Sequence, residues 1–596
     1  MMYGAALVSL LLFGGCAKEE GAMRFSLFTE AYSGGAKVVV DGLTSSWRAG
    51  DHVIVNGVEG AVGVDGEGTP YLDVDVTRWG MGYYAAYPAS AVERCTQNGL
   101  LTLTLPQEYQ YREDDQGHQL LEMPMVAYSE DDRLVFKHLT GALVVKVPHV
   151  NRDIVLDYIM VKSSTSPLSG RGGTVDMNAD SLQVTFGSDT THTVVMYFDR
   201  CPVTIPSNAD TTKDIMIPIA PTTGDGHKFT VTVFAHAVNY ANTYYIFNQK
   251  STEGNMQRNM VAVAKVTFPS SQGIPFLGSG NEPSPYLIQT KVDYKNFLYW
   301  ISASHDNDRW YSLVNDINFG GDTVTAVTSE PGFYGHFNGN GKRLSNVAVI
   351  GSTYSYLTTN NHYLSLFPAM NGGWVKNVSL SEIKLIPPQS SSFANVYVGG
   401  FSSYVRSFSQ GVFLENIHVS NVEYVYSGIS LSVTQMIVGG IVGYLSEATN
   451  SGYLSMQSCE FIQSEPTMAK ISLSTNTLCV GGLIGDALTT DMTLTDCLAN
   501  FGGTQNVMGT TVRTDASTNT YVGAAIGRST SNTVQMVNPL LLKGYMLFIG
   551  NANSNVKKVI GNYSNVTIQG SANTENLHLY RRSYSDSQNT AVTADY

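Results

Sequence analysis

A short glycine motif recurs in the second half of this 596-residue chain at an almost constant interval. The motif reads Val-Gly-Gly, or Val-Gly-Ala in its last copy, and it starts at Val398, Val438, Val480 and Val522, with spacings of 40, 42 and 42 residues. A constant period of this length is typical of repeat proteins, in which each unit buries its apolar face against the next. The motif therefore predicts stacked copies of one small unit rather than a single globular core.

A second series of small polar residues runs in phase with the glycine motif. An Asn, Ser or Asp between apolar positions suits a tight corner, because its side chain hydrogen-bonds to the nearby backbone. Stacked coils would superimpose these corners, so Asn346, Asn377 and Asn416 should form a ladder. We expect stacked strands in this half, with no helices between parallel strands. The apolar residues after the corners should line one column of the core: Val347, Val378, Ile417, Cys459 and Cys497.

The first half of the chain has a different pattern. Residues 23–268 read as short alternating strands separated by frequent turns, which is typical of antiparallel β-sandwiches. Residues 24–30 alternate in this way, with Phe25 and Leu27 on one face and Ser26 on the other. Only 14% of all residues are charged, whereas Gly (57) and Tyr (34) are abundant. We therefore expect an all-β protein of the extracellular kind.

Charge and cysteine content exclude several functions. The formal net charge is -14, and basic side chains do not cluster in the sequence. Nucleic-acid binding requires Lys and Arg gathered on one face to neutralise phosphates, so nucleic acid is not an expected partner. The six cysteines form no Cys-x-x-Cys pair and have no histidine at zinc-binding spacing, which argues against a disulfide framework and against a zinc site. We expect no metal and no other cofactor.

The N-terminus has the features of a bacterial lipoprotein signal. A short apolar run at residues 5–13 leads into Gly14, Gly15 and Cys16, so that small residues directly precede a cysteine. This order resembles a lipobox, which implies acylation of Cys16 and a mature chain that begins there. No apolar stretch of roughly 18 residues or more follows, so a bilayer-spanning helix is not expected. Residues 1–22 are interpreted as signal peptide and tether.

Residues 23–147 resemble the fimbrillin-like family of Bacteroidetes pilus and anchor proteins. The resemblance rests on the order of five short motifs: Trp-x-x-Gly-Asp from Trp47, Tyr-Pro from Tyr87, Leu-Pro-Gln from Leu105, Pro-Met from Pro124 and Phe-x-x-Leu-x-Gly-Ala from Phe136. Residues 148–268 fit the family in order and are expected to form a second domain of the same type. Both domains would be antiparallel β-sandwiches.

After a linker at residues 269–285, residues 286–572 are similar to the GLUG-type repeat. The similarity is clearest in Gly-Ile-Val-Gly from Gly440 and in Gly-Leu-Ile-Gly from Gly482. Proteins with this repeat look like right-handed parallel β-helices and are often bacterial adhesins. Residues 573–596 are expected to form a polar tail.

The two resemblances imply a cell-surface adhesin, attached to the outer membrane by its lipid, that is a minor or tip subunit of a fimbria. Its partners would be other pilus subunits and a glycan or protein ligand of host or bacterial origin. In polymerising members of the family a protease removes the first strand, and a strand of another subunit is added in its place. Here that strand would carry Phe25 and Leu27, and the candidate cleavage residues are Arg24, Lys37 and Arg48.

Two alternatives remain open. A displayed β-helix could instead degrade polysaccharide, which requires carboxylates that converge on one face; the candidates in the repeats are Glu415, Glu460, Asp486, Asp491 and Asp496. The chain could also be a pilus anchor subunit that retains its lipid. The interpretation as an adhesin assigns no catalytic residue and no defined ligand-binding residue; exposed residues of the segments 354–363 and 404–410, for example, could contact the ligand.

Overall fold

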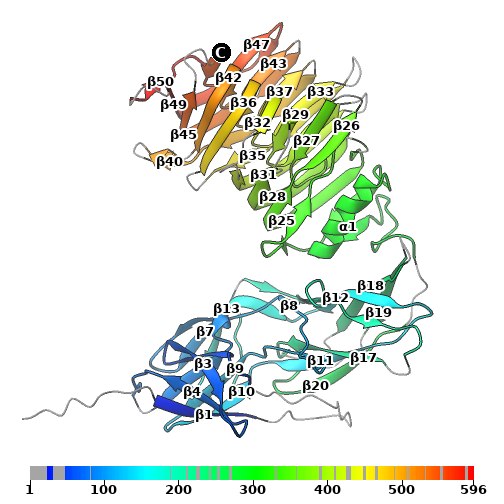
Figure 1. Ribbon diagram of the computed structural model, residues 1–596, viewed down its shortest axis with the longest axis vertical. Coiled ribbons are helices and arrows are strands. Elements are labelled where there is room, and N and C mark those ends of the chain that lie inside the picture. Colours follow the sequence, from blue (N-terminus) through cyan, green and yellow to red (C-terminus); the bar gives the residue numbers. More distant parts are fainter. Residues whose placement is uncertain are drawn as a thin grey trace, which may run out of the picture. The chain divides into compact units, whose positions relative to one another are not determined.

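Figure 1 shows the computed structural model of the chain, which contains two compact units, Met1–Ile274 (unit 1) and Pro275–Tyr596 (unit 2). Both units are built from β-strands, so the expected all-β class is confirmed. The structure describes residues 23–30, 47–80, 82–187, 189–209, 212–222, 228–239, 243–250, 255–267, 272–328, 330, 332–356, 359–387, 392–407, 411–424, 431–447, 452–463, 467–488, 490–504, 507–508, 510–530, 532–550, 555–583 and 588–596. Among these residues, no helix is long and apolar enough to cross a bilayer.

Seven strands of unit 1 follow a closed path around one core. Their order is β1 (Met23–Thr29), β10 (Arg133–His138), β9 (Met125–Ser129), β5 (Tyr83–Tyr87), β2 (His52–Val55), β3 (Val58–Val64) and β4 (Pro70–Val74), which pairs again with β1. Strand β10 shows how the core is filled, because Leu134 and Phe136 are fully buried, whereas Val135 between them is exposed. This period of two directs every second side chain into the core, and closure leaves no free sheet edge.

Further sheets complete the described part of unit 1, as sandwich-type domains require. One has the order β17 (Lys213–Ile219), β11 (Gly141–Val147), β20 (Val261–Lys265); another has β19 (Tyr244–Lys250), β18 (Phe229–Ala237), β12 (Ile154–Ser163), β15 (Thr193–Tyr197), β8 (Glu108–Gln110). A third includes β13 (Ser169–Asp176), β7 (Leu100–Leu105) and β6 (Val92–Cys95). Because β11 pairs with β17 and β20, and β7 pairs with β13, strands from both sides of residue 147 share sheets. The expected boundary at residues 147 and 148 stays a prediction.

In unit 2, successive strands stack in parallel and in register, in three ladders. Ladder A contains β25 (His336–Ile350), β28 (Gly373–Ile386), β31 (Val412–Tyr424) and the shorter strands that continue them to β45 (Leu540–Gly550). Ladder B contains β29 (Ser392–Gly399), β32 (Leu431–Gly439), β36 (Thr467–Gly481) and β42 (Thr510–Gly523). Ladder C contains β30 (Ser402–Ser407), β33 (Val442–Glu447), β37 (Ile484–Leu488), β43 (Ile526–Thr530) and β47 (Ile560–Ser564). Figure 1 shows these strands side by side.

The glycine motif lies where the chain turns from ladder B into ladder C. Gly399 pairs with Gly439, Gly439 with Gly481 and Gly481 with Gly523, so the predicted stacking of the repeats is confirmed. A Cβ atom added to Gly439 would lie 1.7 Å from the carbonyl oxygen of Val442. The two ladders therefore approach too closely for any side chain at this turn, and glycine recurs for that reason.

The corners of ladder A also stack, as expected. Asn377 and Asn416 both have a φ of 55°, and Asn416 Nδ2 donates a hydrogen bond of 3.0 Å to Asn377 Oδ1. Ser458, Asp496 and Asn538 continue the same corner, again with positive φ. Asn and Asp visit this left-handed region more readily than other side chains, so the corner accounts for the second polar series in the sequence.

The structure places Asn346 and Val347 at a different corner from the predicted one. Asn346 also has a positive φ, but Val347 pairs with Ile383 and not with Val378. The register between β25 and β28 shifts at residues 338–342, so this coil places its residues differently from the later ones. Asn346 and Val347 thus belong to a second corner farther along the coil.

A helix stands between two parallel strands at the start of unit 2, where we expected strands alone. In the described part of the chain α1 (Lys291–Ser302) is the only α-helix, and it connects β21 (Tyr286–Ile288) to β22 (Trp310–Leu313). Thr290 and Asp293 form a capping box at its start, which satisfies orphan backbone groups. The ring of Phe297 lies 5.5 Å from that of Phe337 and 5.9 Å from that of Phe367. The helix therefore covers apolar residues of the first coils.

The expected polar tail also differs. Most of residues 573–596 belong to β49 (Ala572–Ser583), which pairs in parallel with β45, and to the short strand β50 (Thr590–Ala591). Leu577 and Leu579 are buried, whereas the residues between and before them are more exposed. The pairing with β45 and this alternating burial place β49 on the preceding coil, so the stack continues beyond residue 572.

Candidate functional site

The candidate cleavage residues lie in different settings. Lys37 lies outside the described residues, as does Cys16, which is the predicted lipidation residue. Arg24 is on β1, where its exposed guanidinium forms an ion pair with Asp73 at 2.6 Å. Arg48 lies before β2, and its main-chain N–H donates a hydrogen bond of 2.9 Å to Asp51 Oδ2. No described contact joins these residues into one site, so their role in cleavage stays a prediction.

The strand expected to be exchanged is fully integrated into the barrel. Strand β1 pairs in parallel with β10 and antiparallel with β4. Phe25 and Leu27 are buried in the barrel core, and the Phe25 ring lies 4.9 Å from that of Tyr83. Removal of β1 would therefore uncover two sheet edges together with the apolar sites that these side chains fill, and such a groove is what strand addition requires.

A second candidate site is a group of tyrosines in unit 2, where ladders B and C meet. One column runs down ladder B, with a first member on β27 (Thr359–Leu364), and the register superimposes its residues from coil to coil. The facing column runs down ladder C. We call these residues the tyrosine corner: Tyr363, Tyr397, Ile437, Cys479 and Tyr521 on ladder B, and Tyr404, Tyr444, Asp486 and Arg528 on ladder C.

The tyrosine rings of the two columns are in mutual contact. The rings of Tyr397 and Tyr444 stack at 5.1 Å with an interplanar angle of 18°. Tyr404 lies 5.3 Å from Tyr397 and 5.4 Å from Tyr444, and Tyr363 lies 5.7 Å from Tyr404. These distances are in the favourable range for aromatic pairs. The corner is thus a packed aromatic cluster.

An ion pair closes the other end of the tyrosine corner. Arg528 Nε donates to Asp486 Oδ1 at 3.0 Å, Arg528 Nη2 lies 2.5 Å from Asp486 Oδ2, and Gln435 Nε2 lies 3.4 Å from the same Oδ2. Burial raises the pKa of Asp486, and the hydrogen bond from Arg528 opposes this shift. The guanidinium also lies over the ring of Tyr521, at 5.5 Å. Arg528 therefore links the carboxylate to the aromatic column.

Part of the tyrosine corner faces solvent. Tyr397 is only 6% exposed, whereas Tyr404, Tyr444 and Tyr521 are half-buried. Burial raises the pKa of Tyr397 and of Tyr444, so both hydroxyls stay protonated near neutral pH. In the described part of the chain, the hydroxyls of Tyr397, Tyr404 and Tyr444 have no hydrogen-bond partner. Each can donate one hydrogen bond and accept others, so the corner combines apolar ring surface with free polar groups.

The sequence located only part of this group. Tyr354 and Tyr404, from the segments expected to contact a ligand, pack against the corner, whereas Tyr363 is buried at 1% exposure and is not the exposed contact that we expected. Residues 408–410 of the second segment lie outside the described residues. Tyr397, Tyr444, Asp486 and Arg528 were missed as members of a common site. A usable signal was present, because they occupy positions two residues before or five residues after the first glycine of each motif.

The acidic residues considered for catalysis are spread over separate contacts. Glu460 Oε2 lies 2.9 Å from His418 Nδ1, Asp491 Oδ1 accepts from the Thr533 N–H at 2.6 Å, and Asp496 Oδ1 accepts from Asn538 at 2.8 Å. Among the described residues, no group of three His, Cys, Asp or Glu side chains is placed to hold a metal ion.

Comparison with known proteins finds a structural similarity but no matching family. No protein-family model matches the chain, and no curated protein matches it either. Among solved structures, the chain is similar to a candidate cell adhesion protein from Bacteroides ovatus, with 13% sequence identity and a TM-score of 0.25. The match covers 42% of this chain and 97% of the other.

Proposed function

We propose that the chain is a cell-surface adhesin whose unit 2 is a right-handed parallel β-helix that presents the tyrosine corner to a glycan or protein ligand. The observation that carries the proposal is the register of ladders B and C, which brings tyrosines from successive coils into one continuous cluster. Such an arrangement gathers tyrosine rings of neighbouring coils at one place, as expected for a surface that contacts a ligand.

The chemistry of the tyrosine corner suits binding. Tyrosine contributes large contact area with few rotatable bonds, so it loses little conformational entropy when a ligand orders it. The paired carboxylate and guanidinium of Asp486 and Arg528 hold the neighbouring side chains in place. Tyr404 and Tyr444 are half-buried and present their hydroxyls without a partner among the described residues.

The finer assignment concerns assembly. We place the chain as a minor or tip subunit of a fimbria, anchored through Cys16 at the outer membrane or joined to other subunits by strand addition at β1. The pairing of β1 on both edges and the burial of Phe25 and Leu27 support this assignment, because a strand of another subunit could repeat the same contacts.

The experiment that tests the proposed function uses the purified full-length chain on an array of immobilised glycans and extracellular matrix proteins. We expect binding to at least one immobilised ligand, and we expect the double variant Tyr404→Ala/Tyr444→Ala to bind at least about tenfold more weakly, equivalent to about 1.4 kcal/mol. Tyr299→Ala is the matched control, because Tyr299 is a tyrosine of unit 2 that is 55% exposed on α1. Equal binding by all three chains would contradict the assignment to the tyrosine corner.

A further inference from the structure

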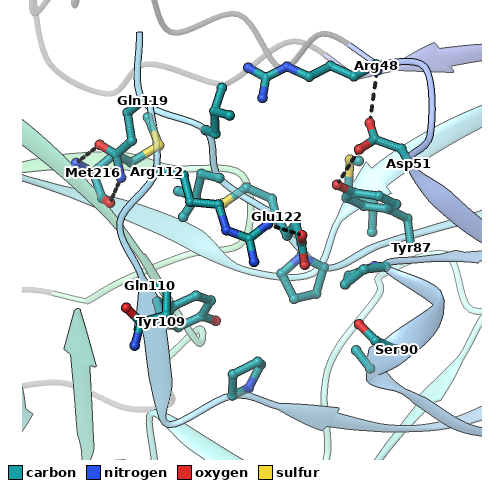
Figure 2. A pocket seen from close by; sticks show the side chains of 18 of the residues that line it. Arg48, Asp51, Tyr87, Ser90, Tyr109, Gln110, Arg112, Gln119, Glu122 and Met216 are labelled. Atoms are coloured by element: carbon teal, nitrogen blue, oxygen red, sulfur yellow. Dashed lines mark hydrogen bonds and ion pairs between the residues drawn. The ribbon is translucent and has the colours of Figure 1, made fainter. Parts of the chain in front are cut away.

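Unit 1 contains a pocket of about 430 Å³ that the proposed function does not use. Its lining comes from the segment before β2, from the end of β5 with the short helix η1 (Ala89–Ala91), from β8 and from the chain between β8 and β9. Figure 2 shows side chains from these elements around one hollow. The volume lies within the range of small-molecule sites, which is about 300 to 1,000 Å³.

The pocket has an apolar part built from aromatic, methionine and proline side chains. Tyr109 on β8 is half-buried, and Met123, Met125 and Met216 are buried. Pro88, Pro106 and Pro124 also line the pocket. Ring and proline faces of this kind offer contact to the C–H groups of a ligand without requiring hydrogen bonds.

The polar part of the pocket contains both signs of charge. Arg112 and Glu122 form an ion pair at 3.5 Å, and Figure 2 shows their side chains facing each other in the middle of the hollow. Asp51 accepts a hydrogen bond from the Arg48 main-chain N–H and lies 3.5 Å from the Tyr87 hydroxyl. Figure 2 shows the Arg48 guanidinium extending away from Asp51. The lining therefore contains both donors and acceptors, and both positive and negative charges.

Two glutamines of the pocket differ in the hydrogen bonds that their side-chain amides form. Gln119 is fixed, because its Nε2 donates to Met216 O at 2.7 Å and its Oε1 accepts from the Met216 N–H at 2.8 Å. Gln110 Oε1 is buried and has no hydrogen-bond partner among the described residues. A buried acceptor without a partner is costly, so a rotation of the Gln110 side chain that brings this oxygen to a ligand donor in the pocket would be favourable.

We infer that this pocket binds a neutral carbohydrate of one or two sugar rings. A hydroxyl group both donates and accepts, so a sugar can bond to Arg112 and Glu122 alike, whereas an anion or a cation would meet a like charge. The pocket volume of about 430 Å³ has room for one or two sugar rings. This site lies in unit 1 and is independent of the tyrosine corner.

The test is saturation-transfer NMR on the full-length chain, with glucose, galactose, mannose, N-acetylglucosamine, lactose and maltose as free probes at millimolar concentration. We expect saturation transfer to at least one of these sugars. The double variant Arg112→Ala/Glu122→Ala should reduce the affinity for that sugar by about tenfold or more. The matched control is Lys384→Ala/Glu423→Ala, which removes an ion pair of unit 2 with a similar separation, 3.4 Å, and the same exposure.

The outcomes are distinct. Loss of saturation transfer in the first double variant, with an unchanged control and an unchanged circular dichroism spectrum, supports the carbohydrate site. If no sugar receives saturation, or if both double variants bind the sugar equally, the inference is overturned. Saturation of free glycine or lysine in place of the sugars would also overturn it, because the site would then prefer a charged ligand. Variants at Tyr404 and Tyr444 should leave this signal unchanged, which separates it from the proposed adhesive function.

Discussion

Arg528 donates hydrogen bonds from two of its nitrogens to the carboxylate of Asp486, which is fully buried and lies on the neighbouring coil. A buried carboxylate is costly unless it is paired and hydrogen-bonded. The pair therefore connects β37 to β43 through side chains as well as through the backbone ladder, and it forms one end of the tyrosine corner.

The first prediction concerns this pair. Asp486→Ala leaves the Arg528 guanidinium without its buried partner, and breaking such a pair typically costs about 3 kcal/mol. We expect native-state hydrogen exchange in peptides from β37 and β43 to report a fall of this size in the free energy of opening. The control is Asp486→Leu/Arg528→Leu, in which both charges are absent, and it should recover more than about 1 kcal/mol of the loss. Equal losses in the single and double variants would show that the pair is not coupled.

The second prediction concerns His138, which is fully buried on β10 near Glu30 and Arg258. Burial lowers its pKa to about 4, whereas the Glu30 charge opposes this shift. The unfolded chain binds a proton near pH 6.5 and the folded chain does not, so stability should fall as the pH drops from about 6.5 to about 4 and should be unaffected by this group above that window.

Integrated over the window, the loss amounts to about 3 kcal/mol. Urea unfolding of the unmodified chain and of His138→Leu at pH 7, 6, 5 and 4.5 isolates this contribution, because all other groups are shared. As the pH falls, the unmodified chain should lose free energy of unfolding relative to the His138→Leu variant. A difference that does not change with pH would refute the prediction.

The third prediction concerns the glycine turn. A Cβ added to Gly481 would lie 1.8 Å from the carbonyl oxygen of Ile484, so Gly481→Ala requires the backbone to move. Overpacking of this kind costs about 1 to 3 kcal/mol or more, and calorimetry should show a lower melting temperature. Gly66→Ala is the control, since a Cβ there has no heavy atom within 4 Å. Equal melting temperatures for the two variants would contradict the steric explanation.

The fourth prediction concerns β1. A chain that lacks residues 23–30 should bind a synthetic peptide of those residues, because the peptide restores pairing with β4 and β10. A peptide with Phe25→Ser and Leu27→Ser should bind more than about 100-fold more weakly, since each buried side chain contributes about 1.5 to 3 kcal/mol. A Ser26→Ala peptide should bind normally, because Ser26 is exposed. Equal affinity of all three peptides would remove the basis for strand addition.

The fifth prediction concerns the lipid. In cells fed an alkyne-tagged palmitate, the unmodified chain should carry the label and Cys16→Ser should not, because the thioether at Cys16 is the attachment point that a lipobox implies. Cys95→Ser should retain the label. Label on the mature Cys16→Ser chain would show that acylation occurs elsewhere or that the N-terminal interpretation is wrong.

The repeat pattern predicted the stacking because its cause is local and steric. Gly399, Gly439, Gly481 and Gly523 recur since no side chain fits at the turn, so the sequence itself marks equivalent places in the coils. The corner series was less reliable, because Asn346 satisfies the same backbone requirement at a different place. A residue type identifies a left-handed corner, but only the register tells which corner it is.

The sequence contains a pattern that predicts helix α1. Thr290 and Asp293 have the spacing of a capping box, and Tyr294, Phe297, Leu298 and Ile301 follow at helical intervals, a pattern that predicts an amphipathic helix. The tyrosine corner, by contrast, required the alignment of the coils. Tyr397 and Tyr444 are far apart in sequence and of different phase, so their contact emerges only once ladders B and C are superimposed.

The stacked corners at Asn377, Asn416 and their successors mean that each coil ends its turn at the same place as its neighbours. Each coil then depends mainly on the two that border it. Insertion or loss of one whole period would preserve every neighbouring contact, whereas a change of half a period would set polar corners against the core. Gene duplication could thus lengthen this part of the molecule stepwise, by one coil at a time.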